Sequence, residues 1–427
     1  MANAFSKEER VAFEDMLEGF QDALVMSRNV SIYRTDGQMM ERARDTIWRP
    51  MPYIATSINS TPGSSISSSY ADFTQLSVPA TLGFSKTVPW TMTTLELRDA
   101  LQEGRLGDSA KQKLASDINV AIMGAAANLG SLVVPIAAAA GDYDDVALCD
   151  AIMNEQGVPD YDRFMALSSR DYNGLAGNLV GTARSFGNQK SDKAYERSYV
   201  GMVAGFDTYK MDYANRQTAA AGGGSITIDT SGAGTQANYA PQATSTSVGG
   251  QINVDNRFQT VTVSSTTSVA AGDAFTIAGV FAVHHITKQS TGQLKTFRVV
   301  SVTNSTTMVI TPPIIGAQSV ATDAQLQYKN VEVSAPSNTA AITFLNVNAA
   351  SVNVFWQRDS LEILPGRYAV PADAGVAVMR ATTDQGIELV LQKFYDIDSM
   401  TIKYRMDTLF GVVNKNPEMS GILLFNQ

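Results

Sequence analysis

A sharp change in sequence character at Ala219–Gly224 divides this chain of 427 residues. From Gly222 to Val280 only four residues are charged: Asp229, Asp255, Arg257 and Asp273. Short runs of alternating apolar and polar residues follow one another here, namely Ile226/Ile228, Phe258/Val261/Val263, Phe275/Ile277, Phe297/Val299 and Met308/Ile310. This spacing predicts a small antiparallel β barrel or sandwich. Because mixed helical and strand patterns resume at about Asn338, we expect the β segment to be an insertion in an α+β body.

The first segment has the pattern of an amphipathic helix. Ser6 and Glu9 form a capping box, and apolar residues then recur at helical spacing from Phe13 to Leu24. The other face is acidic, and its charges include Glu14, Asp15 and Glu18. Two interpretations stay open: an arm that docks on another molecule, or an ordinary amphipathic surface helix.

An uncharged stretch from Ala55 to Tyr70 precedes a run of strict alternation. The alternating residues are Leu76, Val78, Ala80, Leu82 and Phe84. Alternation with period two is typical of a half-buried strand. The flanks of the uncharged stretch are expected to pair as a long β arm with the polar run as its tip. Such an arm has few neighbours in its own chain, so we expect another copy of the protein to cover its apolar face.

The most strongly helical region follows this arm. Two capping boxes, Thr93 with Glu96 and Ser109 with Gln112, precede an apolar stripe that Gly130 ends. From the second box the helix is expected to span roughly 30 Å and to form the spine of a domain. A further helix is predicted from Tyr143 to Gln156. Strands are predicted at 351–355, 387–393 and 400–406, followed by a turn and a final strand.

Composition narrows the range of functions. The net charge is −9 and only 17% of residues are charged, and no basic patch marks a nucleic-acid interface. The single cysteine, Cys149, excludes an intrachain disulfide and is expected to be a small buried hydrophobe. No apolar run predicts a transmembrane helix, and the first residues lack the order of a signal peptide. We therefore expect synthesis and assembly in the cytosol, with no membrane partner.

Catalytic and metal-binding patterns are not found in the sequence. His284 and His285 are the two histidines, and neighbours in a strand point to opposite faces, so one metal ion is not expected to take both. The Asp142, Asp144 and Asp145 group lacks the glycine and distal glutamate of a calcium loop, which favours a solvated turn. Gly222–Gly224 is interpreted as a linker. We expect no enzyme activity, no cofactor and no metal.

Several segments resemble the coat proteins of short-tailed phages of the Salmonella phage P-twenty-two type. They follow the family's order and spacing and lie at Asp45–Pro50, Ala127–Val134, Tyr199–Asp207, Gln251–Val263, Ala271–Val283, Thr287–Leu294 and the last forty residues. The resemblance implies the Hong Kong ninety-seven capsid fold, an α+β fold with a long spine helix, an extended β arm and an axial domain, here with an inserted antiparallel β-barrel domain. The implied segments are an N-terminal arm at 1–50, an extended β loop at 51–92, the spine helix of a peripheral domain at 93–131, an axial and peripheral part at 132–221, the inserted domain at 222–335, and the axial domain with C-terminal peripheral strands at 336–427.

The resemblance also implies a function. Copies are expected to form hexamers and pentamers of an icosahedral procapsid, which expands into a mature head around double-stranded DNA. The implied partners are the protein itself, a scaffolding protein, a portal protein and weakly contacted DNA. The implied location is the virion, after assembly in the bacterial cytoplasm.

Three surfaces follow as hypotheses. Residues 232–250 are expected to match the family's intercapsomer loop but carry no charge, so Asn238, Tyr239, Gln242 and Thr244 would act through hydrogen bonds and packing. The alternative is a flexible loop within the domain. Leu76, Val78, Leu82 and Phe84 would form the intersubunit β arm. Glu14, Asp15 and Glu18 would bind a basic segment of the scaffold, against the alternative of a solvated face. Covalent cross-linking is not implied by this branch of the family, and the sequence shows no obvious Lys–Asn pair placed for it.

Two alternatives are kept. One is an encapsulin-like shell that carries enzyme cargo, and the other is a β-rich phage tail or adhesin protein. A carbohydrate-binding adhesin barrel needs aromatic side chains at its binding surface, yet 222–335 contains no Trp. The sequence leaves open the triangulation number, the host, decoration proteins, strict scaffold dependence and the choice between procapsid and mature conformation.

Overall fold

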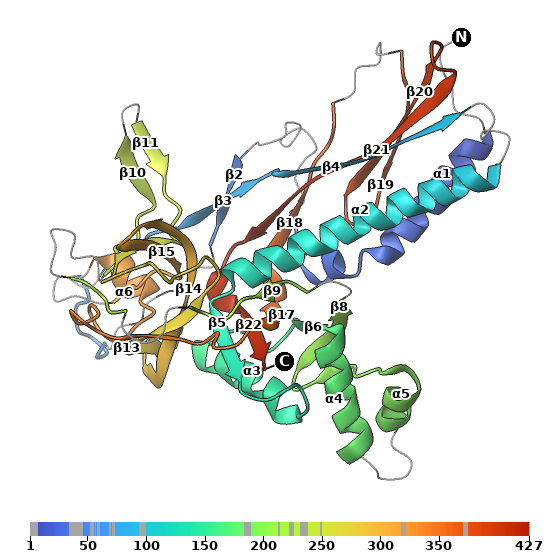
Figure 1. The fold of residues 1–427 in the computed structure, drawn as a ribbon. Coiled ribbons are helices and arrows are strands. Elements are labelled where there is room, and N and C mark those ends of the chain that lie inside the picture. The colour runs from blue at the N-terminus through green and yellow to red at the C-terminus, as the bar shows by residue number, and fades with distance from the viewer. Residues whose placement is uncertain are drawn as a thin grey trace. The chain divides into compact units, whose positions relative to one another are not determined.

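A computed structural model describes residues 7–33, 46–51, 55, 57, 60–67, 70, 73–93, 100–182, 189–211, 214–221, 226–230, 238–247, 250–316, 322–369 and 375–426 (Figure 1). The chain divides into two compact units, each made of separate stretches of sequence. Unit 1 comprises Met1–Ile47, Pro79–Met123 and Leu361–Val413. Unit 2 comprises Trp48–Val78, Gly124–Ser360 and Asn414–Gln427.

Unit 1 combines two helices with a six-stranded sheet. The sheet order is β1-β18-β21-β20-β19, and β4 also pairs with β21. The elements are α1 (Lys7–Ala23), the 3-10 helix η1 (Met26–Asn29), β1 (Ser31–Ile32), β4 (Phe84–Thr93), α2 (Ala100–Leu129), β18 (Leu361–Pro365), β19 (Ala377–Thr382), β20 (Glu388–Asp396) and β21 (Thr401–Asn414). The last turns of α2 and the last residue of β21 belong to unit 2.

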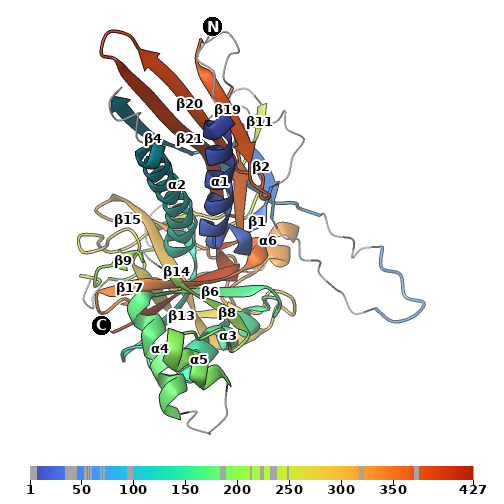
Figure 2. The ribbon, with the colours of Figure 1, turned by 90° about the vertical axis from the view of Figure 1, so that its right-hand side faces the viewer.

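Helix α1 lies alongside α2, as the two ribbon views show (Figures 1 and 2). Its predicted apolar face is buried, with Phe20 and Leu24 fully enclosed. Gly107 of α2 faces α1, since a Cβ there would lie 2.3 Å from Met16 Cε. The Asn119 side-chain amide donates to Ala23 O at 3.1 Å and caps the end of α1. This packing favours the surface-helix interpretation of the N-terminal segment over a detached arm.

The spine helix α2 is one continuous helix. It has 30 residues, which corresponds to about 45 Å at 1.5 Å per residue. The prediction that Ser109 caps a helix start is wrong, since Ser109 lies inside α2 and the helix continues through it. Gly130 does end the helix, and its N–H donates to Ala126 O at 2.8 Å.

The body of unit 2 is a seven-stranded sheet with three helices. The sheet order is β5-β22-β17-β6-β8-β7, and β9 pairs with β17. The elements are β5 (Leu132–Ile136), α3 (Tyr143–Gln156), β6 (Arg163–Ser168), α4 (Ser169–Thr182), α5 (Gln189–Arg197), β7 (Met202–Val203), β8 (Phe206–Met211), β9 (Arg216–Gln217), β17 (Ala350–Gln357), η3 (Arg358–Ser360), η4 (Pro417–Met419) and β22 (Ser420–Phe425). The predicted helix at 143–156, the strands near 351, 387 and 400, and the final strand are confirmed.

A second sheet in unit 2 forms the β domain that the sequence predicts. Its order is β12-β15-β14-β13-β16. The elements are β10 (Thr244–Ser247), β11 (Gly250–Asn253), β12 (Gln259–Thr262), β13 (Ala274–Val283), β14 (Ser290–Asn304), β15 (Thr307–Thr311), α6 (Asp323–Tyr328) and β16 (Ile342–Phe344). Most residues of the predicted alternating runs share one core, among them Ile228, Val261, Phe275, Phe297 and Ile310. The expected end at 335 falls too early, because β16 pairs with β13.

The strands that flank the uncharged stretch do pair. β2 (Thr46–Pro50) and β3 (Ser77–Thr81) form a two-stranded sheet. The premise that the alternating residues lack neighbours in their own chain is wrong for four of them: Leu76, Val78, Ala80 and Leu82 are at most 2% exposed. Leu76 packs with Ile315 and Tyr328 of the inserted domain. Phe84 is 37% exposed and stacks on Phe410.

Candidate functional site

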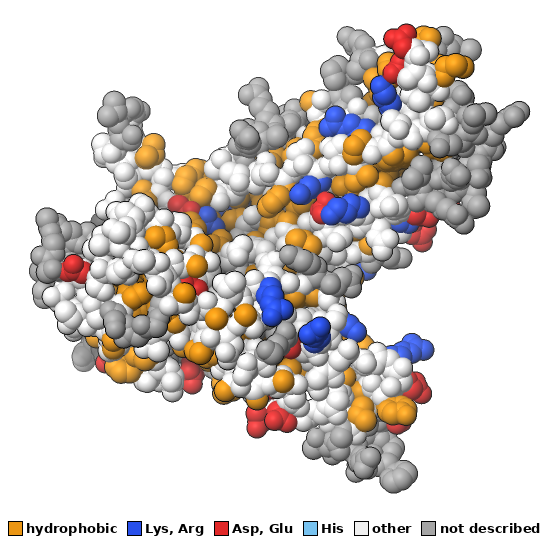
Figure 3. All heavy atoms as spheres, in the orientation of Figure 1, with side chains coloured by type: hydrophobic (Ala, Val, Ile, Leu, Met, Phe, Trp, Pro, Cys, Tyr) orange, Lys and Arg blue, Asp and Glu red, His pale blue; other side chains and the backbone are white. Residues whose placement is uncertain are grey.

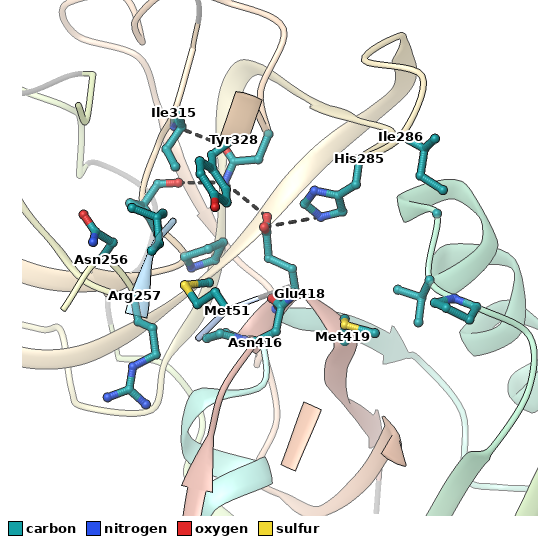
Figure 4. Close-up of a pocket in the computed structure, with 18 residues that line it drawn as sticks. Met51, Asn256, Arg257, His285, Ile286, Ile315, Tyr328, Asn416, Glu418 and Met419 are labelled. Atoms are coloured by element: carbon teal, nitrogen blue, oxygen red, sulfur yellow. Dashed lines mark hydrogen bonds and ion pairs between the residues drawn. The ribbon is translucent and has the colours of Figure 1, made fainter. Parts of the chain in front are cut away.

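A buried polar cluster lies where the inserted sheet meets the turn before β22, within unit 2. Its centre is the Glu418 carboxylate in η4 (Figure 4). Lys295 Nζ, from β14, donates to Glu418 Oε1 at 2.5 Å, and Asn330 Nδ2 donates to the same oxygen at 3.1 Å. Gln156, at the end of α3, accepts from Lys295 Nζ through Oε1 at 2.9 Å. Lys295 and Asn330 therefore contact the carboxylate directly, and Gln156 joins the cluster through Lys295.

The second oxygen of Glu418 faces His285. Its Oε2 lies 3.3 Å from His285 Nε2, a contact without hydrogen-bond geometry (Figure 4). Burial lowers the pKa of His285 to about 4, although Glu418 opposes this shift. The imidazole is therefore neutral at neutral pH. Burial alone raises the pKa of Glu418, but the attraction of Lys295 and His285 outweighs it and holds the pKa at about 2.

A cavity of about 200 Å³ adjoins this cluster. Its walls are mostly apolar and include Met51, Leu76, Val158, Pro312 and Ile315. Glu418, His285 and Asn330 supply polar groups in the lining (Figure 4). Such a mixture of apolar walls and a few converging polar groups is typical of sites that admit small molecules.

Acid is expected to weaken this junction. His285 has a pKa of 6.5 in the unfolded chain and about 4 in the fold. Between these values the unfolded chain binds a proton that the folded chain excludes, so stability falls as the pH falls, by up to about 3 kcal/mol. Hydrogen exchange of amides in β13 and β14 measures this loss. In His285→Gln the loss over this pH interval should disappear, and an unchanged pH dependence would refute the assignment.

The structure places the predicted loop residues at the root of a β hairpin. The Asn238 side chain makes both of its hydrogen bonds to the Gly316 backbone: Oδ1 accepts from the Gly316 N–H at 2.9 Å, and Nδ2 donates to Gly316 O at 3.1 Å. Tyr239 donates its hydroxyl proton to Asn256 Oδ1 at 3.0 Å. Gln242 and Thr244 have exposed side chains. Asn238 and Tyr239 therefore fix the root of the hairpin through hydrogen bonds within the domain.

The hairpin itself presents uncharged strands. β10 and β11 pair from Thr244↔Asn253 to Ser247↔Gly250. All four residues of β11 are exposed, and Ile252 is 54% exposed. Figure 1 shows the hairpin standing off from the strands of the inserted sheet. Strands with open edges are able to pair with another chain.

The acidic residues of the N-terminal helix lie in unit 1. Glu14, Asp15 and Glu18 of α1 are all exposed, away from the buried Phe13 and Phe20. Within the described residues no ion pair to these three carboxylates is formed. The space-filling view shows that charged side chains are sparse on the face it presents (Figure 3).

Other candidates from the sequence have structural roles. Asp142 caps α3 and forms a capping box with Asp145, so the acidic group is a helix start and not a free turn. His284 Nδ1 accepts from the Ile286 and Thr287 amides. Cys149 is buried, as expected.

In the described part of the chain, no three His, Cys, Asp or Glu side chains cluster in a way that could hold a metal ion. No helix among these residues is long and apolar enough to cross a membrane.

Sequence reasoning missed the Glu418 cluster. Its members carry no motif, because Gln156, Lys295, Asn330 and Glu418 are far apart in sequence. The one available signal was the predicted turn that contains Glu418. Burial of a lysine and a glutamate together becomes visible only once the strands are paired.

Solved structures similar to this chain include a phage coat protein domain and phage capsids. The CUS-3 coat protein I-domain is 41% identical, with 29% of this chain and 96% of that chain covered and a TM-score of 0.23. A chain from the structure of Mycobacterium phage Che8 is 9% identical, covering 93% of this chain and 94% of that one at a TM-score of 0.43. A chain from the capsid structure of Cyanophage P-SCSP1u is 8% identical, covering 93% and 90% at a TM-score of 0.43.

A long spine helix, an extended arm, a mixed sheet and an inserted β domain are the parts of a phage coat protein, a structural protein that builds a shell. Residues 1–426 match the model of the family described as P22 coat protein, gene protein 5. The chain belongs to the P22 coat protein family. It is a major capsid protein of the virion, and its copies associate into an icosahedral shell. The resemblance and the capsid fold that it implied are confirmed.

Proposed function

We propose that this coat protein closes its shell through contacts of the β10–β11 hairpin with a copy in a neighbouring capsomer. The observation that supports this most is an exposed, uncharged two-stranded hairpin on a root held by side-chain hydrogen bonds. A fixed root limits the entropy lost when the strands bind. Open strand edges, Gln242, Thr244 and Ile252 supply hydrogen bonds and an apolar contact. Salt bridges play no part, because 232–250 has no charged residue.

Ile252→Asp tests this contact. The side chain is 54% exposed, so the variant is expected to fold. Each copy loses about 1–2 kcal/mol of contact free energy, which a closed shell multiplies over many copies. The yield of closed shells, measured by sedimentation and electron microscopy, should drop by more than about tenfold. Ile286→Asp, at a position 67% exposed elsewhere in the domain, is the matched control. Equal shell yields for both variants would exclude the hairpin contact.

The extended arm is proposed to contact a neighbouring copy beyond its buried base. The base is held within the chain, since the Tyr328 hydroxyl donates to Thr74 O at 3.0 Å. Further out, Tyr70 is 80% exposed and Phe73 is 62% exposed. Exposed aromatic side chains are typical of protein interfaces. We propose contact through Tyr70 and Phe73 in place of contact through the buried Leu76, Val78 and Leu82. The ring of Phe84 is partly exposed and is able to contact the neighbouring copy.

A scaffolding protein is proposed to bind the acidic face of α1. Three exposed carboxylates, Glu14, Asp15 and Glu18, lie close together on one helix and fit a basic segment. Replacing all three by Ala is expected to lower scaffold incorporation by about tenfold at low salt. Co-sedimentation of scaffold with assembled shells measures this effect. The same triple change at exposed Asp144, Glu155 and Asp160 is the control, and undiminished incorporation in the α1 variant would disprove the role.

The remaining partners follow from the capsid role. We propose that the shell is built first as a procapsid in the bacterial cytoplasm, that it includes a portal protein, and that it expands around double-stranded DNA. The net charge of −9 supports weak, non-specific contact with DNA. The arm and the hairpin are the natural moving parts of such an expansion.

A further inference from the structure

The cavity beside the Glu418 cluster is large enough for a molecule with one ring. Its volume of about 200 Å³ exceeds the roughly 150 Å³ of an apolar protein cavity that takes up benzene. A six-membered ring with one or two small substituents therefore fits. Every residue of the lining belongs to unit 2, so the cavity lies inside one compact unit of the fold.

The walls of the cavity favour an aromatic ring. Pro312, Pro313 and Pro417 present rigid apolar rings, and Met51 and Met419 add two thioether side chains. Methionine side chains adapt to the shape of a bound group, and their sulfur atoms make favourable contacts with aromatic rings. An aliphatic ring of the same size lacks these contacts with sulfur. The lining therefore selects a flat aromatic molecule.

Several polar side chains of the lining already have hydrogen bonds within the protein. Asn256 and Arg257 donate to backbone oxygens, each at 2.8 Å. Asn330 bonds to the Glu418 carboxylate and to two backbone groups. Because their hydrogen bonds are made inside the chain, these three residues are not the ones that select the polar group of a bound molecule.

His285 and Glu418 supply the polar end of the site. His285 Nε2 lies 3.3 Å from Glu418 Oε2 without hydrogen-bond geometry, and this buried nitrogen has no hydrogen-bond partner among the described residues (Figure 4). A hydroxyl oxygen is able to lie within about 3 Å of both atoms, where it donates to the carboxylate and accepts from the imidazole N–H. A second anion beside Glu418, or a second cation beside Lys295, is costly to bury, whereas a neutral hydroxyl is not.

We propose that this cavity binds a small, neutral aromatic alcohol of the phenol class, one molecule in each copy. The ring lies among the apolar walls, and the hydroxyl bridges Glu418 Oε2 and His285 Nε2. His285 and Pro312 belong to the inserted domain, whereas Pro417 and Glu418 belong to the turn before β22. The bound molecule contacts both parts and thereby stabilises the junction between them.

Isothermal titration calorimetry of the full-length chain with p-cresol and with toluene tests the proposal. The two probes share the ring and the methyl group and differ only in the hydroxyl. One p-cresol should bind per chain, at least about tenfold more tightly than toluene, because toluene leaves the buried carboxylate and imidazole without a hydrogen bond. Equal affinities for the two probes, or no binding of p-cresol, would overturn the proposal.

Met51→Trp locates the site. The Met51 side chain is partly exposed and lines the cavity, so a larger ring there takes up the space of the ligand and should weaken p-cresol binding by at least about tenfold. Met202→Trp, at a position 57% exposed in β7, is the matched control and should leave the affinity unchanged.

Hydrogen exchange of the wild-type chain gives a second readout that depends on no variant. Bound p-cresol should slow the exchange of amides at 285–288 and 416–419, which surround the proposed hydroxyl position. Undiminished binding of p-cresol in Met51→Trp, or slower exchange confined to other segments, would place the binding elsewhere and refute the site.

Discussion

Replacing Glu418 by alanine is expected to destabilise the inserted domain by about 3–5 kcal/mol, because it leaves the Lys295 cation buried without a counter-charge. Lys295 is 1% exposed and its other side-chain partner is the neutral Gln156. Asn330 loses an acceptor at the same time. Native-state hydrogen exchange of β14 amides in the full-length chain measures the effect, as a fall in protection of more than about a hundredfold.

Glu332→Ala provides the matched control. Glu332 lies on the exposed surface of the same domain, where it accepts from the Ser290 hydroxyl at 2.6 Å. Exposed polar contacts of this kind contribute at most about 1 kcal/mol. If Glu418→Ala costs no more than Glu332→Ala, the buried cluster does not hold the inserted sheet to the turn before β22.

Replacing Gly421 by valine is expected to prevent folding of unit 2. Gly421 lies in β22, between β5 and β17. A Cβ at this position would lie 2.4 Å from Leu132 O and 2.4 Å from Phe355 Cζ. A backbone oxygen in a central sheet has nowhere to move, so the overpacking costs more than about 3 kcal/mol. Soluble yield and thermal melting of the full-length chain measure the loss.

Gly177→Ala is the matched control for this steric argument. Gly177 lies within α4, and a Cβ there meets no heavy atom within 4 Å. Alanine at an open helical site should be neutral or stabilise by up to about 1 kcal/mol. A Gly421→Val chain that melts at the wild-type temperature would contradict the close packing of β22 on β5.

Local patterns in the sequence predicted much of the fold. The alternation at Phe275/Ile277 and Phe297/Val299 identified core strands of the inserted domain, and a helix was predicted from about Tyr143 to Gln156, where α3 lies. Such signals arise between neighbours in sequence, where periodicity reports which face is buried. Ser109 misled the prediction of the spine helix, since tertiary packing along α1 sustains α2 through a residue that favours caps.

Contacts between segments that are distant in sequence could not be predicted from periodicity. Leu76 and Val78 alternate as an exposed arm would, yet the inserted domain covers Leu76 through Ile315 and Tyr328. The Glu418 cluster likewise depends on strand pairing that periodicity does not encode. Asn238 and Tyr239 were rightly singled out as polar residues of the loop, but their hydrogen bonds turn inward and hold the hairpin root.

Electron microscopy of the protein, expressed alone and together with its scaffolding protein, tests the central claim most directly. A coat protein of this family should give closed, uniform shells with visible capsomers, with density from the β10–β11 hairpin bridging neighbouring capsomers. Monomers or small oligomers under both conditions would contradict a shell-forming role and favour a tail or adhesin protein.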